Sequence, residues 1–267
     1  MRIEQTAVYQ HFRASERGFI DQATDWLTRV SETYSIVTTD FLNPRQVFIL
    51  ETLANAREIQ VLTSSAIAET EYVKVILAPD YYVLDVADFE LALLQIDFAS
   101  QFVTLKHGQI LGTFLGETGL DRSKIGDIVV HDTIAQVFVT ANLASIFVTS
   151  IHKIARSGVK ISEMPLSKFI VGQEETAIAK VITVSSLRLD KAVSAVFNIS
   201  RNLAQNLIQS NKIKVNYAES VKNDFDLVDG DLVSVRGYGR FTVAETLGVT
   251  KKDKTRVEVK LIATKKK

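Results

Sequence analysis

Residues 186–216 read SLRLDKAVSAVFNISRNLAQNLIQSNKIKVN, and this stretch predicts two short helices that run into a strand. In the first helix, apolar residues recur every three or four positions, as on the buried side of an amphipathic helix. These residues are Leu187, Leu189, Ala192, Val193 and Val196. Arg188 and Lys191 lie one turn apart on the other side, so the helix carries a basic stripe.

The second helix begins after Ser200, a residue type that commonly caps helices. We expect its apolar residues to face the core and its polar residues to face outward. The former are Leu203, Ala204, Leu207 and Ile208, and the latter are Arg201, Asn202, Gln205, Asn206 and Gln209. Asn211 is expected to close the helix, because asparagine tolerates the left-handed backbone conformation. Ile213 and Val215 then alternate with two lysines, as in a strand with one buried side.

Four segments of this region match the S-four RNA-binding domain in order and spacing. They are RLDKAV (188–193), SRNLAQNLI (200–208), KIKVN (212–216) and VDGDLVSV (228–235). The chain therefore resembles that family, which implies a module that grips structured RNA. In two places it departs from the family pattern: Asn211 stands where glycine is usual, and Tyr217 replaces the hairpin glycine. Tyr217 leads us to expect a different turn at the hairpin.

Basic and amide side chains of this module are the candidate RNA ligands. Guanidinium groups bind phosphate oxygens bidentately, and amides can bond to ribose or base edges. The predicted RNA-binding residues are Arg188, Lys191, Arg201, Asn202, Gln205, Lys212, Lys214, Arg236 and Arg240. The alternative is that these exposed charges only keep the protein in solution. We expect substitution of the basic residues to leave the fold nearly unchanged.

Composition sets the frame for the rest of the chain. Its 267 residues, 46% of them hydrophobic with only three prolines, predict two or three folded domains. The absence of cysteine excludes disulfides and thiolate nucleophiles. No apolar run reaches the roughly 18 residues of a membrane span, and the start lacks a secretory signal. We therefore expect a cytoplasmic protein without a membrane partner.

Charge divides the chain unevenly. Residues 185–267 hold 16 Lys and Arg against 9 Asp and Glu, whereas residues 1–184 hold 15 against 22. This asymmetry indicates that the C-terminal part meets a polyanion.

The predicted fold class is α+β with three small domains. Residues 1–88 predict an N-terminal α/β domain. A helical repeat covers 5–38, where Phe12, Phe19 and Trp26 are seven residues apart. A second helix begins at Asn43-Pro44 and reaches about Arg57, and strands are expected at 59–63 and 72–77. Residues 185–267 are the S-four domain.

Residues 91–184 predict the middle domain. Its signals are a strand (95–105), a helix (107–117), strands (127–131 and 136–140), a helix (141–151) and a strand (155–161). This order is that of the ferredoxin-like plait, also found in RRM domains. Gly112, Gly116 and Gly119 cost helix stability, so we expect them to allow a close contact with the sheet or with a partner, and we favour packing on the sheet.

Several segments of the first two domains resemble the YlmH family of bacterial S-four proteins. They are His11-Phe12, FLNPR (41–45), Pro79 with Tyr81, and HGQILGTFLGETGLDRSKIGDI (107–128). With the C-terminal module, the resemblance covers nearly the whole chain. It implies binding to large-subunit rRNA and tRNA in ribosome-associated quality control. Residues 64–70, SSAIAET, replace the family's GGYxxAER, so an RNA contact there is not expected.

Catalytic and metal sites find little support. The four histidines lack metal-ligand spacing, and no P-loop is present, so we expect no metal, cofactor or catalytic residue. RLDKAVS imitates the catalytic loop of pseudouridine synthases, but Val193 replaces the expected threonine. Asp190 is therefore interpreted as a carboxylate of the first helical turn. We predict a non-catalytic protein that binds structured RNA on the large ribosomal subunit, and no DNA; the alternative is an RNA-modifying enzyme targeted by its S-four domain.

Overall fold

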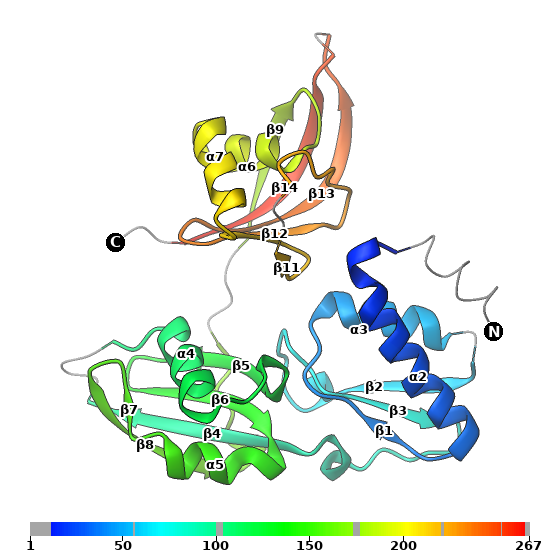
Figure 1. Cartoon of the computed structure of the whole chain (residues 1–267), viewed down its shortest axis with the longest axis vertical. Coiled ribbons are helices and arrows are strands. Elements are labelled where there is room, and N and C mark those ends of the chain that lie inside the picture. The colour runs from blue at the N-terminus through cyan, green and yellow to red at the C-terminus, as the bar shows by residue number, and fades with distance from the viewer. Residues whose placement is uncertain are drawn as a thin grey trace. The chain divides into compact units, whose positions relative to one another are not determined.

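In the computed structural model, the described residues are 12–55, 57–99, 104–172, 177–219, 222–251 and 253–264. The fold is α+β, as predicted, and it divides into two compact units, Met1–Gln173 and Glu174–Lys267 (Figure 1). None of the helices in these ranges has the length and apolar character that a membrane crossing needs. His11 and the first residues of the predicted 5–38 helix lie outside the described residues, as do residues 100–103 of the predicted 95–105 strand.

The first half of unit Met1–Gln173 contains a small sheet covered by two helices. The helices are α2 (Arg17–Thr33) and α3 (Pro44–Ala54), and the strands are β1 (Val37–Thr38), β2 (Ile59–Thr63) and β3 (Val75–Pro79), in the order β1-β3-β2. On α2, Ile20, Ala23, Leu27 and Val30 are buried at helical spacing, and the predicted Phe19 and Trp26 pack half-buried against the same core. Asn43 caps α3 by accepting from the Gln46 backbone N–H at 3.0 Å.

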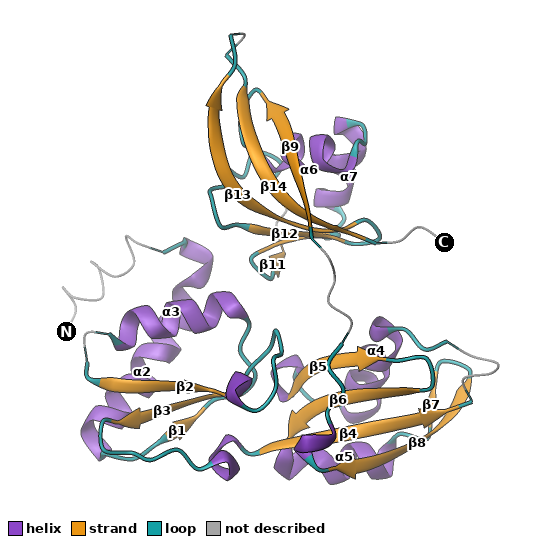
Figure 2. Ribbon diagram, turned by 180° about the vertical axis from the view of Figure 1, so that it is seen from behind, coloured by secondary structure: helices purple, strands orange, loops and turns teal. Residues whose placement is uncertain are grey.

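The second half of this unit is built on an antiparallel sheet. Its strands are β4 (Leu91–Phe98), β5 (Ile125–Val130), β6 (Ile134–Thr140), β7 (Lys153–Ile154) and β8 (Ser157–Met164), in the order β5-β6-β4-β8-β7. The helices α4 (His107–Thr118) and α5 (Ala144–Ser150) cover one face (Figures 1 and 2). Phe114 of α4 stacks on Phe147 of α5 with ring centroids 4.9 Å apart.

The opposite face of this sheet is covered in part. Phe138 of β6 lies 4.7 Å from the ring of Phe169, and Phe41 packs on the same cluster. Gln136 is buried and holds the covering segment: its amide donates to the Lys168 carbonyl and accepts from the Ile170 N–H. Protein side chains therefore cover the part of this face around Phe138 and Gln136, whereas Lys160 of β8 stays exposed.

A buried lysine joins the two halves. Lys74 is only 1% exposed, and its Nζ donates to the carbonyl of Glu90 at 3.2 Å. The Glu90 carboxylate lies 3.9 Å away, and burial lowers the pKa of Lys74. The same Glu90 carbonyl accepts from Ala141 N–H, so a single carbonyl receives donors from both halves of the unit.

The unit Glu174–Lys267 packs two helices on a curved sheet. The helices are α6 (Leu189–Phe197) and α7 (Arg201–Gln209), and the strands are β9 (Ile178–Val184), β10 (Ile213–Val215), β11 (Ala218–Glu219), β12 (Leu232–Val235), β13 (Gly239–Val249) and β14 (Thr255–Ala263). Their order is β11-β10-β12-β13-β14-β9. β9 pairs with β14, so residues 178–184, predicted to end the middle domain, belong here instead (Figure 2).

Both predicted ends of α7 are confirmed. The Ser200 hydroxyl accepts from the Leu203 N–H at 3.2 Å. Asn211 is left-handed, with φ of 54°, and Lys212 N–H returns to the Leu207 carbonyl at 3.0 Å, as in a Schellman ending. Leu203, predicted to face the core, is instead 39% exposed. The buried residues of α7 are Ala204, Leu207 and Ile208.

The glycines of α4 contradict the packing prediction. A Cβ added at Gly112 or Gly116 meets nothing within 4 Å, so neither residue allows a close contact within the described structure. Gly119 has a separate role, since it ends the helix with φ of 66°. Gly126 in β5 is the crowded glycine: a Cβ there would lie 2.5 Å from the Phe41 ring.

We therefore expect opposite effects from two alanine substitutions. Gly112→Ala should raise the unfolding free energy by about 1 kcal/mol, because alanine is the better helix former and meets open space. Gly126→Ala should lower it by about 1–3 kcal/mol through overpacking against Phe41. Urea unfolding followed by circular dichroism measures both, and a destabilised Gly112→Ala protein would show that this helix face is already in contact.

Candidate nucleic-acid interface

A buried carboxylate organises the predicted basic face. Asp190 lies in the first turn of α6 and its side chain is 0% exposed. Arg201, the first residue of α7, places both Nε and Nη2 at 2.8 Å from Asp190 Oδ2. The Gln205 amide donates to the same oxygen at 3.0 Å. Asp190 thus links the two helices through residues that we predicted to be RNA ligands.

The second oxygen of Asp190 faces another predicted ligand. Arg188, the residue that caps α6, holds Nε at 3.5 Å from Asp190 Oδ1. Burial alone would raise the pKa of Asp190, but hydrogen bonds from Arg201 and Gln205 and the charges of Arg201 and Arg188 hold that pKa below its ordinary value. The carboxylate is therefore ionised and compensates the two guanidinium groups.

Lys191 completes the cluster without contacting Asp190. Its Nζ donates to the hydroxyls of Ser185 at 2.8 Å and Ser186 at 3.0 Å. The sequence motif thus brings Arg188, Lys191, Arg201 and Gln205 together around the α6–α7 junction, and Asn202 is exposed beside them on α7. We call these five residues the helix cluster.

Two other predicted ligands project from the opposite side of the sheet. Ile213 and Val215 are buried under the helices, so Lys214 between them points away. Register places Lys214 opposite Ser234 and Ser234 opposite Arg240, so these three side chains share the outer face of the sheet.

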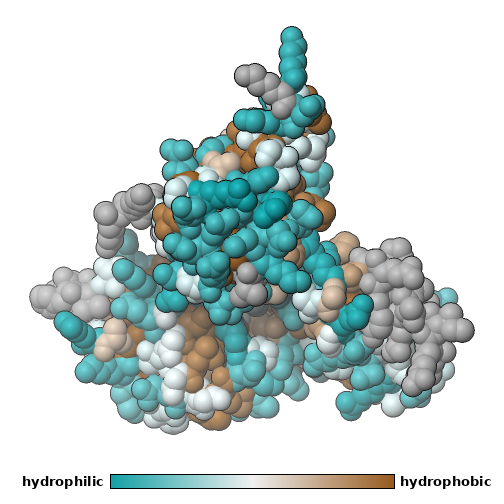
Figure 3. All heavy atoms as spheres, turned by 45° about the horizontal axis from the view of Figure 1, so that its top comes forward, coloured by the Kyte–Doolittle hydropathy of each residue, from teal (hydrophilic) through white to brown (hydrophobic). Residues whose placement is uncertain are grey.

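The last two predicted ligands lie next to each other at the end of these strands. Arg236 N–H donates to the Lys212 carbonyl at 2.9 Å, and both side chains are exposed. The nine predicted ligands do not share one face, since strand alternation separates Lys214 and Arg240 from the helix cluster. Hydrophilic residues predominate on the face of the C-terminal unit that Figure 3 shows at its top and centre.

The hairpin that follows Lys214 corrects one prediction. Val215 pairs with Ala218, so Asn216 and Tyr217 form a two-residue turn, with φ of 48° and 69°. Positive φ at both positions is what a type I′ hairpin requires, so Tyr217 takes the place of glycine without changing the turn length. Asn216 fixes this conformation: its amide donates to Asp231 Oδ1 at 2.8 Å and accepts from Leu232 N–H at 3.0 Å.

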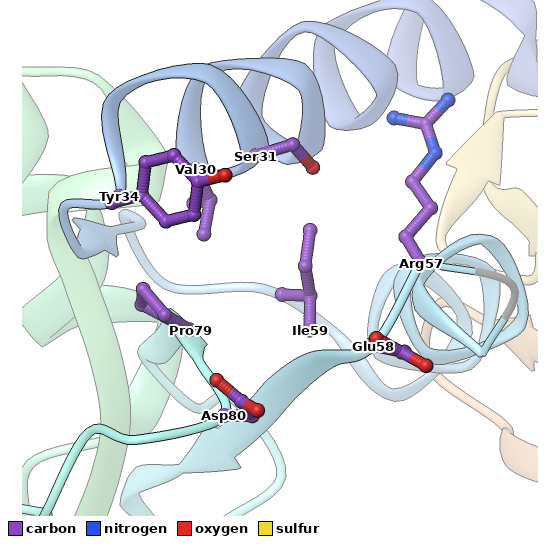
Figure 4. A pocket seen from close by; sticks show the side chains of 8 residues that line it. All are labelled: Val30, Ser31, Tyr34, Arg57, Glu58, Ile59, Pro79 and Asp80. Carbon is purple, nitrogen blue, oxygen red and sulfur yellow. The ribbon is translucent and has the colours of Figure 1, made fainter.

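Elsewhere the structure offers little that resembles a reaction centre. In the ranges described, no group of His, Asp and Glu is placed to hold a metal ion. A shallow pocket of about 230 Å³ lies between α2 and the start of β2 (Figure 4). It is lined by Val30, Ser31, Tyr34, Arg57, Glu58, Ile59, Pro79 and Asp80, none of which is a predicted site residue. The replaced motif at 64–70 starts at a buried serine, Ser64, whose hydroxyl accepts from Lys74 N–H.

Two family models match this chain. Residues 15–82 match the family described as "YlmH, N-terminal", and residues 85–168 match "Putative RNA-binding domain in YlmH". Together these matches cover more than half of the chain. The chain belongs to the YlmH family.

Two members of this family are close enough to compare directly. The chain is 35% identical over 250 residues to "Ribosome-associated protein quality control protein P2" of Bacillus subtilis, covering 94% of this chain and 96% of that protein. It also resembles the solved structure of "Cell division protein ylmH from Streptococcus pneumoniae", with 34% identity and a TM-score of 0.54. That structure is covered over 99% of its length and corresponds to 61% of this chain.

Sequence reasoning identified the basic residues of the helix cluster but missed their common partner. Asp190 was interpreted as a carboxylate that interacts with the helix dipole, a local role. The sequence did hint at this partner, because Asp190 stands in RLDKAV close to Arg188 and eleven residues before Arg201. Only the crossing of α6 and α7 brings Arg201 onto Asp190, and that crossing is not readable from spacing.

The low pKa of Asp190 predicts a pH dependence of stability. Because the folded-state pKa lies below the unfolded value of about 3.9, the carboxylate contributes stability above that value and loses it as pH falls through the folded pKa. Asp190→Asn should cost about 1–3 kcal/mol at pH 7, since it weakens a buried charged network. Urea unfolding of the two proteins should give converging stabilities below about pH 4.

Asp253→Asn at the exposed hairpin tip is the matched control and should follow the parent protein throughout this range. If the difference between parent and Asp190→Asn is as large at pH 3 as at pH 7, Asp190 is not the ionised partner of these arginines.

Proposed function

We propose that this chain is a non-catalytic RNA-binding protein of the cytoplasm that acts on the ribosome. Its RNA ligands would be large-subunit rRNA and tRNA, and its role would be ribosome-associated quality control. The related Bacillus subtilis protein carries the name of a ribosome-associated quality control protein, and residues 85–168 match a family described as RNA-binding. The observation that carries the proposal is the helix cluster, where two arginines and a lysine are held at one helix junction.

The proposed module for this contact is an S-four domain in residues 178–264. The helix pair, the hairpin and the strand after VDGD occur in the order that the family signature implies. Arg201 spends two of its five N–H donors on Asp190 and is half exposed, so the other three can meet phosphate. Such a surface reads the shape and backbone of structured RNA.

For residues 91–164 we propose a ferredoxin-like plait. The strand order β5-β6-β4-β8 and the two helices on one face support that assignment. RRM domains bind RNA by stacking bases on exposed aromatic residues of the sheet. Here Phe138 is 2% exposed under Phe169, so RNA contacts of this half would come from loops and helices rather than the sheet.

The alternative, a pseudouridine-synthase-like enzyme, finds less support. The residue at the nucleophile position of that motif would be Asp190, which is fully buried and engaged by Arg201 and Gln205. A carboxylate in that state cannot reach a substrate. We therefore propose that the chain positions RNA and does not modify it.

The test is to remove the three charges of the helix cluster while sparing Asp190. Alanine is unsuitable, because it would leave the buried Asp190 carboxylate with neither a charge nor a donor from the two arginine positions, contrary to the expectation of a nearly unchanged fold. Glutamine also removes the charge, but it retains an N–H₂ donor for the carboxylate. Arg188→Gln, Lys191→Gln and Arg201→Gln together should weaken binding to purified Bacillus subtilis large ribosomal subunits about a hundredfold at 0.1 M salt. The slope of log affinity against log salt should fall by about 2 to 3.

A control variant carries the same charge change in the other unit. Lys153, Arg156 and Lys160 are exposed, and their triple glutamine variant should bind nearly as the parent does. Equal binding by parent and helix-cluster variant, with both folded, would reject the helix cluster as the RNA site. Arg236, Arg240 and residues 251–256 would then be the next candidates.

A further inference from the structure

One acidic side chain stands in the middle of the proposed RNA site, and the proposed function gives it no role. An anion among phosphate-binding groups weakens affinity by simple Coulomb repulsion. Asp190 nevertheless lies at the centre of the helix cluster, with 0% exposure and an arginine within ion-pair distance of each oxygen. Its position needs an explanation beyond helix capping, because the α6 N-terminus is already satisfied: Leu189 and Asp190 N–H donate to the Phe225 and Asn223 carbonyls.

The geometry points to Asp190 as the positioning residue of the RNA site, which fixes the guanidinium groups of Arg188 and Arg201 before RNA binds. This inference rests on the proposed function of the helix cluster. Arginine side chains lose rotamer freedom when they bind, and a site that has already fixed them loses less affinity to that ordering. The gain in preorganisation then outweighs the repulsion from a carboxylate that both cations screen.

The contacts support a positioning role for Asp190 and an RNA-binding role for the arginines. Arg201 approaches with two nitrogens at 2.8 Å, a two-point contact that sets the plane of its guanidinium group. Gln205 donates to the same oxygen at 3.0 Å and so fixes the carboxylate itself. Arg188 occupies the other oxygen at 3.5 Å, with its Nε buried and without a hydrogen-bond partner among the described residues. One carboxylate therefore holds a cation from each helix.

Asp190 acts through the arginines, so its effect depends on their presence. Removing the negative charge by Asp190→Asn makes the face more positive, and Coulomb attraction alone would tighten RNA binding. Loss of positioning predicts the reverse: binding to purified Bacillus subtilis large subunits about fivefold to tenfold weaker, the order expected when one or two long side chains must be ordered on binding. Coulomb attraction and loss of positioning therefore predict opposite changes in the affinity of Asp190→Asn.

A double-mutant cycle separates positioning from a general structural effect. In the background of Arg188→Gln with Arg201→Gln, Asp190→Asn should no longer weaken binding, because no guanidinium group is left to position. If Asp190→Asn weakens binding equally in both backgrounds, or tightens it in the parent, the inference is overturned. If the helix-cluster triple glutamine variant binds as the parent does, the helix cluster is not the RNA site, and the part of the proposed function on which this inference rests fails instead.

Arg201→Lys provides a second test that keeps Asp190 and the net charge. Lysine is a single-point cation and cannot make the two-nitrogen contact with Asp190 Oδ2. We expect affinity for the same subunits to fall about fivefold. The matched control, Lys160→Arg in the other unit, should bind as the parent does. Unchanged binding of Arg201→Lys would overturn the inference even if Asp190→Asn failed to fold.

Discussion

A buried aspartate is the constraint on which the C-terminal unit depends. An ionised carboxylate with no exposed surface is stable only if nearby donors and cations replace the lost water. For Asp190 these come from two helices: Arg188 at the start of α6, and Arg201 with Gln205 on α7. The helices must therefore cross where they do, and the cations that compensate Asp190 are the same groups that face solvent. Stability and the proposed RNA contact thus use one network.

The N-terminal unit differs, because its buried polar side chains bind backbone groups within the unit and do not hold other side chains toward solvent. Gln136 holds residues 168–170 against one face of the second sheet, and Lys74 joins the two halves through Glu90. The part of that sheet face around Phe138 and Gln136 is therefore closed to bases. The side of α4 that carries Gly112 and Gly116 is open, since a Cβ at either position meets nothing within 4 Å among the described residues.

Local chemistry was predictable from the sequence, whereas contacts between distant segments were not. The caps at Asn43 and Ser200 and the left-handed Asn211 follow from residue type, and the order of elements follows from apolar periodicity. The pairing of β9 with β14 could not be predicted, since residues 178–184 precede the motif and pair across more than seventy positions. Tyr217 shows a related limit: side chains around Asn216 impose the turn that glycine would have favoured. The proposed RNA ligands could be selected by residue type, but their division between two sides of the sheet needed the strand register.

The most direct test of this account is a cryo-electron microscopy map of the protein on the ribosomal particle with which it purifies, at a resolution that shows side chains. Such a map should show Arg188 and Arg201 in contact with RNA phosphates while both still contact Asp190. A map in which the start of α6 and α7 faces solvent or another protein, with RNA bound elsewhere on the chain, would contradict it.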